Sequence, residues 1–289
     1  RVILRNYINY IWKNTSQWSS FLLEFYLHAE STIKCWKSTD YEYKYEAAKS
    51  YFAKGQNSRA ATILEELIPI LKGTANGEES LYMLGMTYYN QGDFVTASHY
   101  FNTYYTTYPR GTYTELARFH SGKALYLDTP EPRLDQSSTY KAIQELQMFM
   151  EYFPTSQRKD IAQSMIFELQ DKLVEKEYLS SKLYYDLGSY SGNASYSSTG
   201  NNYLAAIVTA QNVLKEYPYT KMREELSILI LRAKYHMAKE SVLEKREDRM
   251  RETVDEYYAF KNEFPESKYM KEVEDIFKEV SKYISTDEE

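Results

Sequence analysis

The chain has 289 residues, of which 43% are hydrophobic, and this composition is that of a folded globular protein with a sizeable core. Its net charge is −6, and the 35 basic residues are interspersed with 41 acidic ones, so the sequence lacks the basic stripe of a nucleic-acid-binding protein. The single cysteine, Cys35, excludes an internal disulfide framework and a cysteine-based metal cage.

Residues 1–36 do not match a targeting segment. A secretory signal has basic residues, then an uninterrupted apolar stretch, then small residues before the cleavage point. The best apolar run, Phe21 to Leu27, contains Glu24 and is shorter than the roughly 18 residues that a membrane-spanning helix needs. We therefore treat residues 1–36 as an atypical segment and expect the folded domain over residues 37–289.

Aromatic-proline pairs punctuate the rest of the chain. A small residue stands twelve positions before each proline and a bulky one five positions before it, which is typical of a helix that packs closely on a neighbour and then stops. The same residue types stand at these three positions in four segments, which indicates an internal repeat. The four pairs are Tyr108-Pro109, Phe153-Pro154, Tyr217-Pro218 and Phe264-Pro265.

The segment 78–111 fits the 34-residue tetratricopeptide pattern without a gap. Gly85 supplies the small residue where the two helices of the hairpin approach most closely, opposite Ala97. Gly92 stands at the turn between them, where glycine tolerates a positive φ. This segment therefore predicts a helix-turn-helix unit.

The same pattern extends along the chain and predicts an all-α tetratricopeptide-repeat superhelical solenoid. We expect about five hairpins followed by a capping helix, and no strand. A stretch rich in glycine, serine and asparagine, residues 188–202, predicts a long loop inside the fourth hairpin. The expected hairpins cover residues 41–75, 78–111, 114–155, 160–219 and 222–267, and the cap covers 268–284.

Motifs for catalysis are missing from the sequence. It has no phosphate-binding glycine loop, no His-Glu-x-x-His and no nucleophile elbow. Its four histidines, His28, His99, His120 and His236, are scattered over different segments, and a lone histidine on a helix is usually a packing or surface residue. We expect a binding scaffold without a cofactor or a metal, not an enzyme.

The expected binding surface is the concave side of the hairpin stack, which the first helix of each unit lines. Aromatic rings beside amide and lysine groups suit a peptide backbone and apolar side chains together. The alternative, that any one of these rings only packs between units, stays open. The predicted groove residues are Tyr45, Lys49, Phe52, Tyr82, Met86, Tyr89, Asn90, Phe119, Lys123 and Tyr126.

Three stretches resemble one family. Residues 37–48, residues 203–207 with 217–220, and residues 238–242 with 264–267 look like the BamD family of outer-membrane assembly lipoproteins, in its Bacteroidota-type form. The resemblance covers about residues 37 to 284. It implies a lipid-anchored protein on the periplasmic face of the outer membrane, within the machinery that folds β-barrel proteins.

The resemblance also implies partners. The first repeats would receive C-terminal peptides of unfolded outer-membrane proteins, and the last repeats would dock the periplasmic domains of the BamA-like barrel-forming partner. The basic residues Arg223, Arg232 and Arg246 are our candidates for that docking. The alternative function is another periplasmic repeat adaptor, serving cell-wall or division machinery.

The N-terminus departs from the family, whose members carry a lipidated cysteine shortly before the first repeat. The residues Ile33-Lys34-Cys35-Trp36 are not such a site, so we assign no lipidated residue in this chain. Reading the codons of residues 27–36 from their third base can give Ser-Cys followed by Tyr-Asn-Lys-Met-Leu. We therefore expect that residues 1–36 are a frame-shifted lipoprotein signal.

Overall fold

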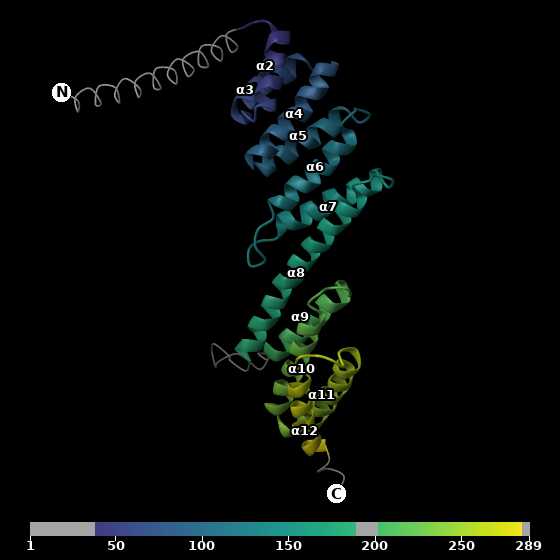
Figure 1. Ribbon diagram of the computed structural model, residues 1–289. Coiled ribbons are helices and arrows are strands. Elements are labelled where there is room, and N and C mark those ends of the chain that lie inside the picture. The colour runs from purple at the N-terminus through teal and green to yellow at the C-terminus, as the bar shows by residue number, and fades with distance from the viewer. Residues whose placement is uncertain (1–37, 189–201, 285–289) are drawn as a thin grey trace, which may run out of the picture. The chain divides into compact units, whose positions relative to one another are not determined.

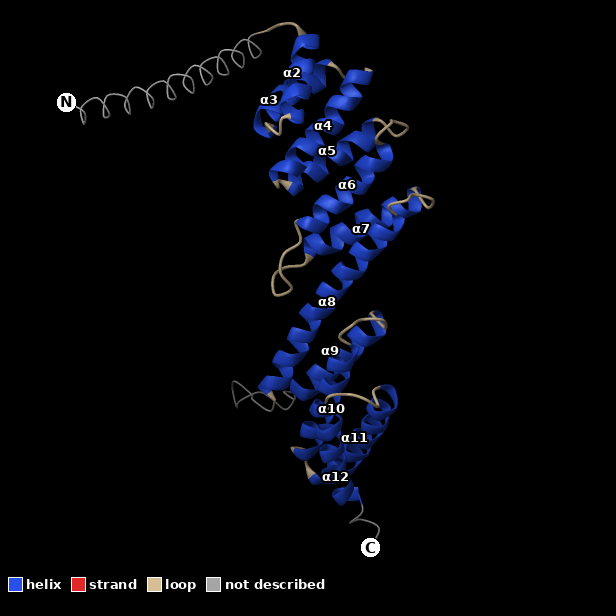
Figure 2. Cartoon of the chain, viewed as in Figure 1, coloured by secondary structure: helices blue, strands red, loops and turns tan. Residues whose placement is uncertain are grey.

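The computed structural model describes residues 38–188 and 202–284 (Figure 1). All regular structure in these two ranges is helical, as Figure 2 shows. The chain divides into two compact units between Asp128 and Thr129. The expectation for residues 1–36, and the greater part of the predicted loop 188–202, lie outside the described residues.

Unit one contains five described helices, and each packs against the next. Polar side chains fix where three of them begin: Asp40, Thr74 and Asp93 each accept a hydrogen bond from a backbone N–H three residues on. Gly92, with a φ of 79°, ends one helix in the left-handed conformation that glycine adopts without strain. The helices are α2 (Tyr41–Ala53), α3 (Asn57–Ile70), α4 (Ala75–Gln91), α5 (Phe94–Thr107) and α6 (Thr114–Leu127).

The interior of unit one is built from the repeat positions of the sequence. Leu64 and Leu84 are fully buried in the cluster that joins α2, α3 and α4, and Ala97 and Phe101 are fully buried in the cluster that joins α4, α5 and α6. A Cβ on Gly85 would lie 2.7 Å from the Phe101 ring. A larger residue at position 85 would therefore crowd the Phe101 ring where α4 crosses α5.

Unit two contains six described helices, again packed in sequence. One of them has 29 residues and contacts α7 as well as α9. The helices are α7 (Ser137–Tyr152), α8 (Lys159–Leu187), α9 (Asn202–Glu216), α10 (Arg223–Lys239), α11 (Leu243–Glu263) and α12 (Met270–Ile284).

The last helix of unit two closes its hydrophobic core. Val273, Ile276 and Val280 of α12 are buried against α10 and α11, whereas Lys271 and Lys278 on its other side are exposed. A terminal helix with a polar outer face is what a stack of repeats needs at its end. This arrangement confirms the prediction of an all-α chain of helical hairpins with a C-terminal capping helix.

The third hairpin differs from the continuous domain that we expected. Its first helix, α6, belongs to unit one, and its second helix, α7, belongs to unit two. The nine residues between them, 128–136, contain two prolines, which cannot continue a helix. No helix in the described part of the chain is long and apolar enough to cross a bilayer.

Candidate functional site

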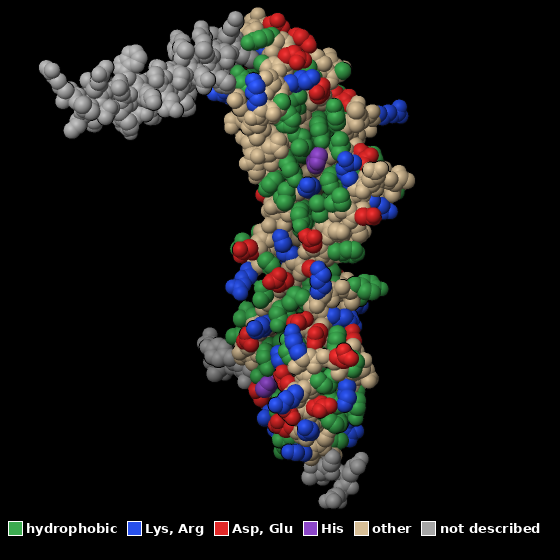
Figure 3. Space-filling model, viewed as in Figure 1, with side chains coloured by type: hydrophobic (Ala, Val, Ile, Leu, Met, Phe, Trp, Pro, Cys, Tyr) green, Lys and Arg blue, Asp and Glu red, His purple; other side chains and the backbone are tan. Residues whose placement is uncertain are grey.

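Hydrophobic side chains gather on one face of unit one, over α4, α5 and α6 (Figure 3). We define the aromatic patch by residues from α4, from α6 and from the turn before α6. Their side chains are neither buried in the core nor fully exposed, so a ligand could cover them further. The residues of the patch are Tyr82, Met86, Tyr89, Tyr113, His120 and Lys123.

Ring contacts connect α4 to α6 across the aromatic patch. The Tyr82 ring stacks on that of Tyr113, with centroids 4.7 Å apart and planes 11° from parallel. The Tyr82 hydroxyl lies 3.0 Å from Nδ1 of His120. The Tyr89 ring lies 5.8 Å from the His120 ring, and the Lys123 ammonium lies 5.8 Å from the centroid of Tyr89. The patch thus combines aromatic surface with a histidine and a cation.

Two residues of the patch, Tyr113 and His120, are not among those predicted from the sequence. In the sequence, each histidine stands apart from the others, so we expected it to be a packing or surface residue. A signal was present, since His120 precedes the predicted Lys123 by three positions and an i,i+3 pair shares a helix face. Its contact with Tyr82, 38 residues away, needed the structure.

Two predicted groove residues are buried instead. Only 3% of Tyr45 is exposed, and its hydroxyl donates a hydrogen bond to Glu79 on α4. Burial, together with this bond, raises the pKa of Tyr45. Phe119 is 5% exposed. The expectation that these two rings face a groove is therefore wrong, because they pack inside unit one.

The remaining predicted groove residues lie around the patch or apart from it. Phe52 packs half-buried against the cluster of α2 and α3, and Tyr126 is half-buried near the end of α6. Lys49 pairs with Glu79 at 3.6 Å. Asn90 is exposed at the end of α4, one residue after Tyr89. The structure thus brings together Tyr82, Met86, Tyr89 and Lys123 from the predicted set.

The three arginines predicted for partner docking each have a partner inside unit two. Arg223 pairs with Glu263 at the end of α11. Arg246 donates to the backbone oxygen of Ser241 at 2.9 Å. Each of these contacts ties the arginine to a group of the same unit.

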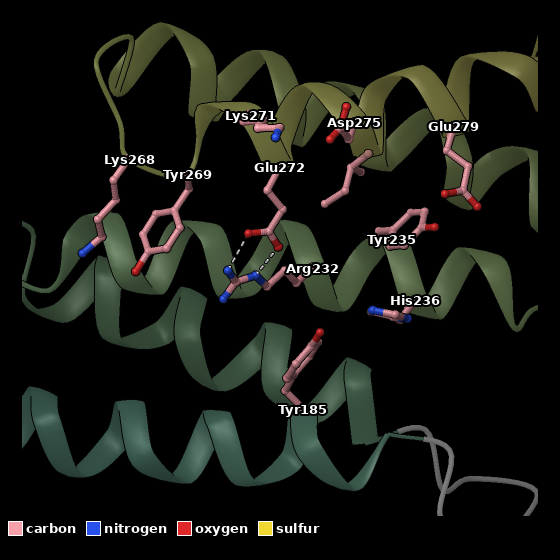
Figure 4. Close-up of a pocket in the computed structure, with 11 residues that line it drawn as sticks. Tyr185, Arg232, Tyr235, His236, Lys268, Tyr269, Lys271, Glu272, Asp275 and Glu279 are labelled. Carbon is pink, nitrogen blue, oxygen red and sulfur yellow. Dashed lines mark hydrogen bonds and ion pairs between the residues drawn. The ribbon is translucent and has the colours of Figure 1, made fainter.

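Arg232 lies in a pocket of about 490 Å³ between α8, α10 and α12 (Figure 4). Its guanidinium donates two hydrogen bonds to Glu272, at 2.6 and 2.7 Å, and it lies 5.2 Å from the ring centroid of Tyr269. These hydrogen bonds raise the pKa of Arg232. The nearby His236 is partly buried, which lowers its pKa and favours the neutral ring. This pocket is a mixed-charge surface whose central pair stabilises the docking of α12.

A family model described as "YfiO: Outer membrane lipoprotein" matches residues 37–250. The chain belongs to this family. The match spans helices from both units and confirms the resemblance at the level of the outer-membrane lipoprotein family.

Two solved structures whose titles describe TPR-like repeats were also found. A crystal structure titled as a kinesin light chain of Podosopora anserina with nearly identical TPR-like repeats has 12% identity, covers 78% of this chain and 96% of its own, and has a TM-score of 0.30. A point variant of that protein has 12% identity, covers 78% and 95%, and has a TM-score of 0.31. No curated protein sequence matches this chain.

In the described ranges, no three His, Cys, Asp or Glu side chains are placed to hold a metal ion. The aromatic patch offers ring faces for apolar side chains and offers tyrosine hydroxyls and an imidazole for hydrogen bonds. Such a surface suits a peptide.

Proposed function

We propose that this outer-membrane lipoprotein is a scaffold of the β-barrel assembly machinery. In this proposal unit one binds the C-terminal peptides of unfolded barrel proteins, and unit two docks the periplasmic domains of the BamA-like barrel-forming subunit. A lipid anchor would hold the native protein on the periplasmic face of the outer membrane. The family match supports the general role, and the aromatic patch of unit one carries the assignment of the peptide site.

The chemistry of the substrate matches the aromatic patch. Strands of outer-membrane barrels alternate apolar with polar residues and carry aromatic residues at the membrane interfaces. An unfolded C-terminal strand therefore presents aromatic side chains at regular spacing together with unpaired backbone groups. The rings of Tyr82 and Tyr89 would pack against those side chains, and Asn90 at the exposed end of α4 would meet the backbone.

Photo-crosslinking tests the peptide site directly. Benzoylphenylalanine placed at Tyr89 should crosslink to a synthetic C-terminal peptide of a barrel protein. The matched control is Tyr88, the preceding residue on α4, whose ring instead stacks on that of Tyr100, with centroids 5.4 Å apart. Crosslinks from position 89 and not from position 88 support the assignment. Equal crosslinking, or crosslinks from position 88 alone, would remove the patch from the proposal.

Docking by unit two needs a different test. Reversing Arg232 would also break its pair with Glu272, so that variant cannot separate docking from folding. Lys271 lines the same pocket and is exposed on α12, and Lys141 is an exposed lysine on α7. We expect Lys271→Glu to reduce capture of the partner's periplasmic domains and Lys141→Glu to leave it unchanged. Recovery of cell-wall or division proteins in place of a barrel-forming partner would contradict the proposed function.

A further inference from the structure

Unit two contains a second surface that the proposed function does not use. It is an open groove of about 640 Å³ between the first half of α8 and the loop that follows α9. We name it the α8–α9 groove. It is lined by Ser164, Phe167, Glu168, Gln170, Asp171, Val174, Glu216, Tyr217, Pro218, Tyr219, Thr220 and Lys221.

The groove exists because the two helices of the fourth hairpin differ in length. Helix α8 has 29 residues, whereas α9 has 15 and ends at Glu216. The chain then turns at Pro218, which cannot continue a helix. The side of α8 around Phe167 therefore faces a loop instead of a helix, and the Phe167 ring stays uncovered.

Two large aromatic side chains on the groove are open to solvent. Phe167 on α8 is 56% exposed, and Tyr219 on the loop is 97% exposed. A single exposed ring is ordinary on a protein surface. Two rings that line one groove, one from the helix and one from the loop, have instead the composition of an interface anchor site.

Acidic groups surround these rings. Glu168, Asp171 and Glu216 line the groove, and the only basic residue among the described residues of its lining, Lys221, pairs with Asp171 at 3.2 Å. The Thr220 hydroxyl also donates to Asp171, at 3.5 Å. The lining therefore carries an excess of negative charge that favours a cationic ligand.

We propose that the α8–α9 groove binds a short segment of a partner protein that carries an arginine next to an apolar side chain. A guanidinium stacks on aromatic faces and pairs with carboxylates, so it complements both the rings and the acidic groups. The adjacent apolar side chain would cover Phe167 and Pro218. This site is independent of the peptide site in unit one.

The test uses the full chain and fluorescein-labelled eight-residue peptides of alternating sequence, with binding followed by anisotropy. We expect the Arg-Leu peptide to bind, and the Glu-Leu and Arg-Ser peptides to bind at least about tenfold more weakly. Tyr219→Ala should weaken Arg-Leu binding about tenfold. It cannot act by damaging the fold, because the side chain is 97% exposed.

Two controls separate this groove from the rest of the molecule. Tyr152→Ala removes a tyrosine that is 60% exposed on α7 and does not line the groove, and it should leave Arg-Leu binding unchanged. Tyr89→Ala should also leave it unchanged, because Tyr89 belongs to the patch of unit one. The inference is overturned if the Arg-Leu peptide binds no better than the Glu-Leu peptide, or if Tyr219→Ala does not weaken it. Neither outcome bears on the peptide site of unit one.

Discussion

The Gly85→Ala substitution probes how α4 crosses α5. The added methyl would lie 2.7, 2.8 and 3.2 Å from three carbons of the Phe101 ring. That ring is fully buried, and it contacts both Tyr82 and His120, with centroids 5.7 and 5.5 Å away. The ring cannot yield without moving residues of the aromatic patch.

Two opposing effects set the magnitude. Overpacking a core typically costs about 1–3 kcal/mol. Replacing glycine by alanine inside a helix contributes about 0.8–1.0 kcal/mol in the other direction. We therefore expect Gly85→Ala to lower the free energy of unfolding by roughly 1 kcal/mol, within a range of about 0–2 kcal/mol.

A second substitution isolates the steric effect. In a Phe101→Leu background the smaller side chain makes room for the methyl, so Gly85→Ala should cost less there and can become stabilising. Gly92→Ala is the matched control, because no atom lies within 4 Å of its added methyl and its cost comes from the positive φ alone. That cost should be the same in both backgrounds.

Urea unfolding of the full chain, followed by circular dichroism, measures the total effect. Hydrogen exchange of peptides from α4 and α5 shows where the structure opens. The reasoning fails if Gly85→Ala stabilises the protein in both backgrounds, or if its cost is independent of residue 101.

Two further predictions concern hydrogen-bonded side chains. Arg232→Ala should loosen α12 and so speed hydrogen exchange in that helix. The free energy of unfolding should fall by only up to about 1 kcal/mol, because Arg232 and Glu272 are partly exposed. Unchanged hydrogen exchange in α12 would contradict this prediction. The pKa of Tyr88 is raised, chiefly by its hydrogen bond to Glu65, and that of Tyr104 by burial and Glu78. The contribution of these neutral hydroxyls to the free energy of unfolding is therefore fully present below about pH 10. It is lost as the pH rises toward the pKa values of the folded state. The melting temperature should fall above pH 10, and Tyr88→Phe with Tyr104→Phe should make that fall smaller; an equal fall in the double variant would contradict the assignment.

The helices were predictable from the sequence because their signals are local. Small residues at the close approaches, aromatic-proline stops and the glycine at the α4 turn each act within one hairpin. The fold class and the capping helix follow from these signals. The division near Asp128 did not follow from them, because it depends on which helices pack against each other.

The site was only partly predictable, because exposure depends on the neighbouring hairpin. Tyr45, Tyr82 and Phe119 each precede a small residue, Ala48, Gly85 or Gly122, by three positions. Only Tyr82 is left half-buried, whereas α4 covers Tyr45 and bonds its hydroxyl through Glu79. The residue pattern within one hairpin does not show which of its side chains are covered by a segment more than 30 residues away.

The partners of the basic residues in unit two did leave a regular signal. Arg223, Arg232 and Lys239 each pair with a glutamate 40 residues further along the chain. Charge pairs at one constant separation indicate helices that pack side by side. The separation alone does not identify the pairs, because Lys234 also has a glutamate, Glu274, 40 residues on and pairs with Glu256 instead.

The most direct test of the account is the affinity of the full chain for a labelled C-terminal peptide of a barrel protein. Tyr89→Ala removes a ring of the aromatic patch, and Tyr88→Ala removes a ring of the same size from the adjacent position, where it bonds Glu65 at 2.5 Å. We predict that Tyr89→Ala weakens binding about tenfold or more, as expected for an aromatic anchor, and that Tyr88→Ala leaves the affinity within about twofold. Equal affinities for the wild type and Tyr89→Ala, or a comparable loss in both variants, would contradict the assignment of this surface to substrate binding.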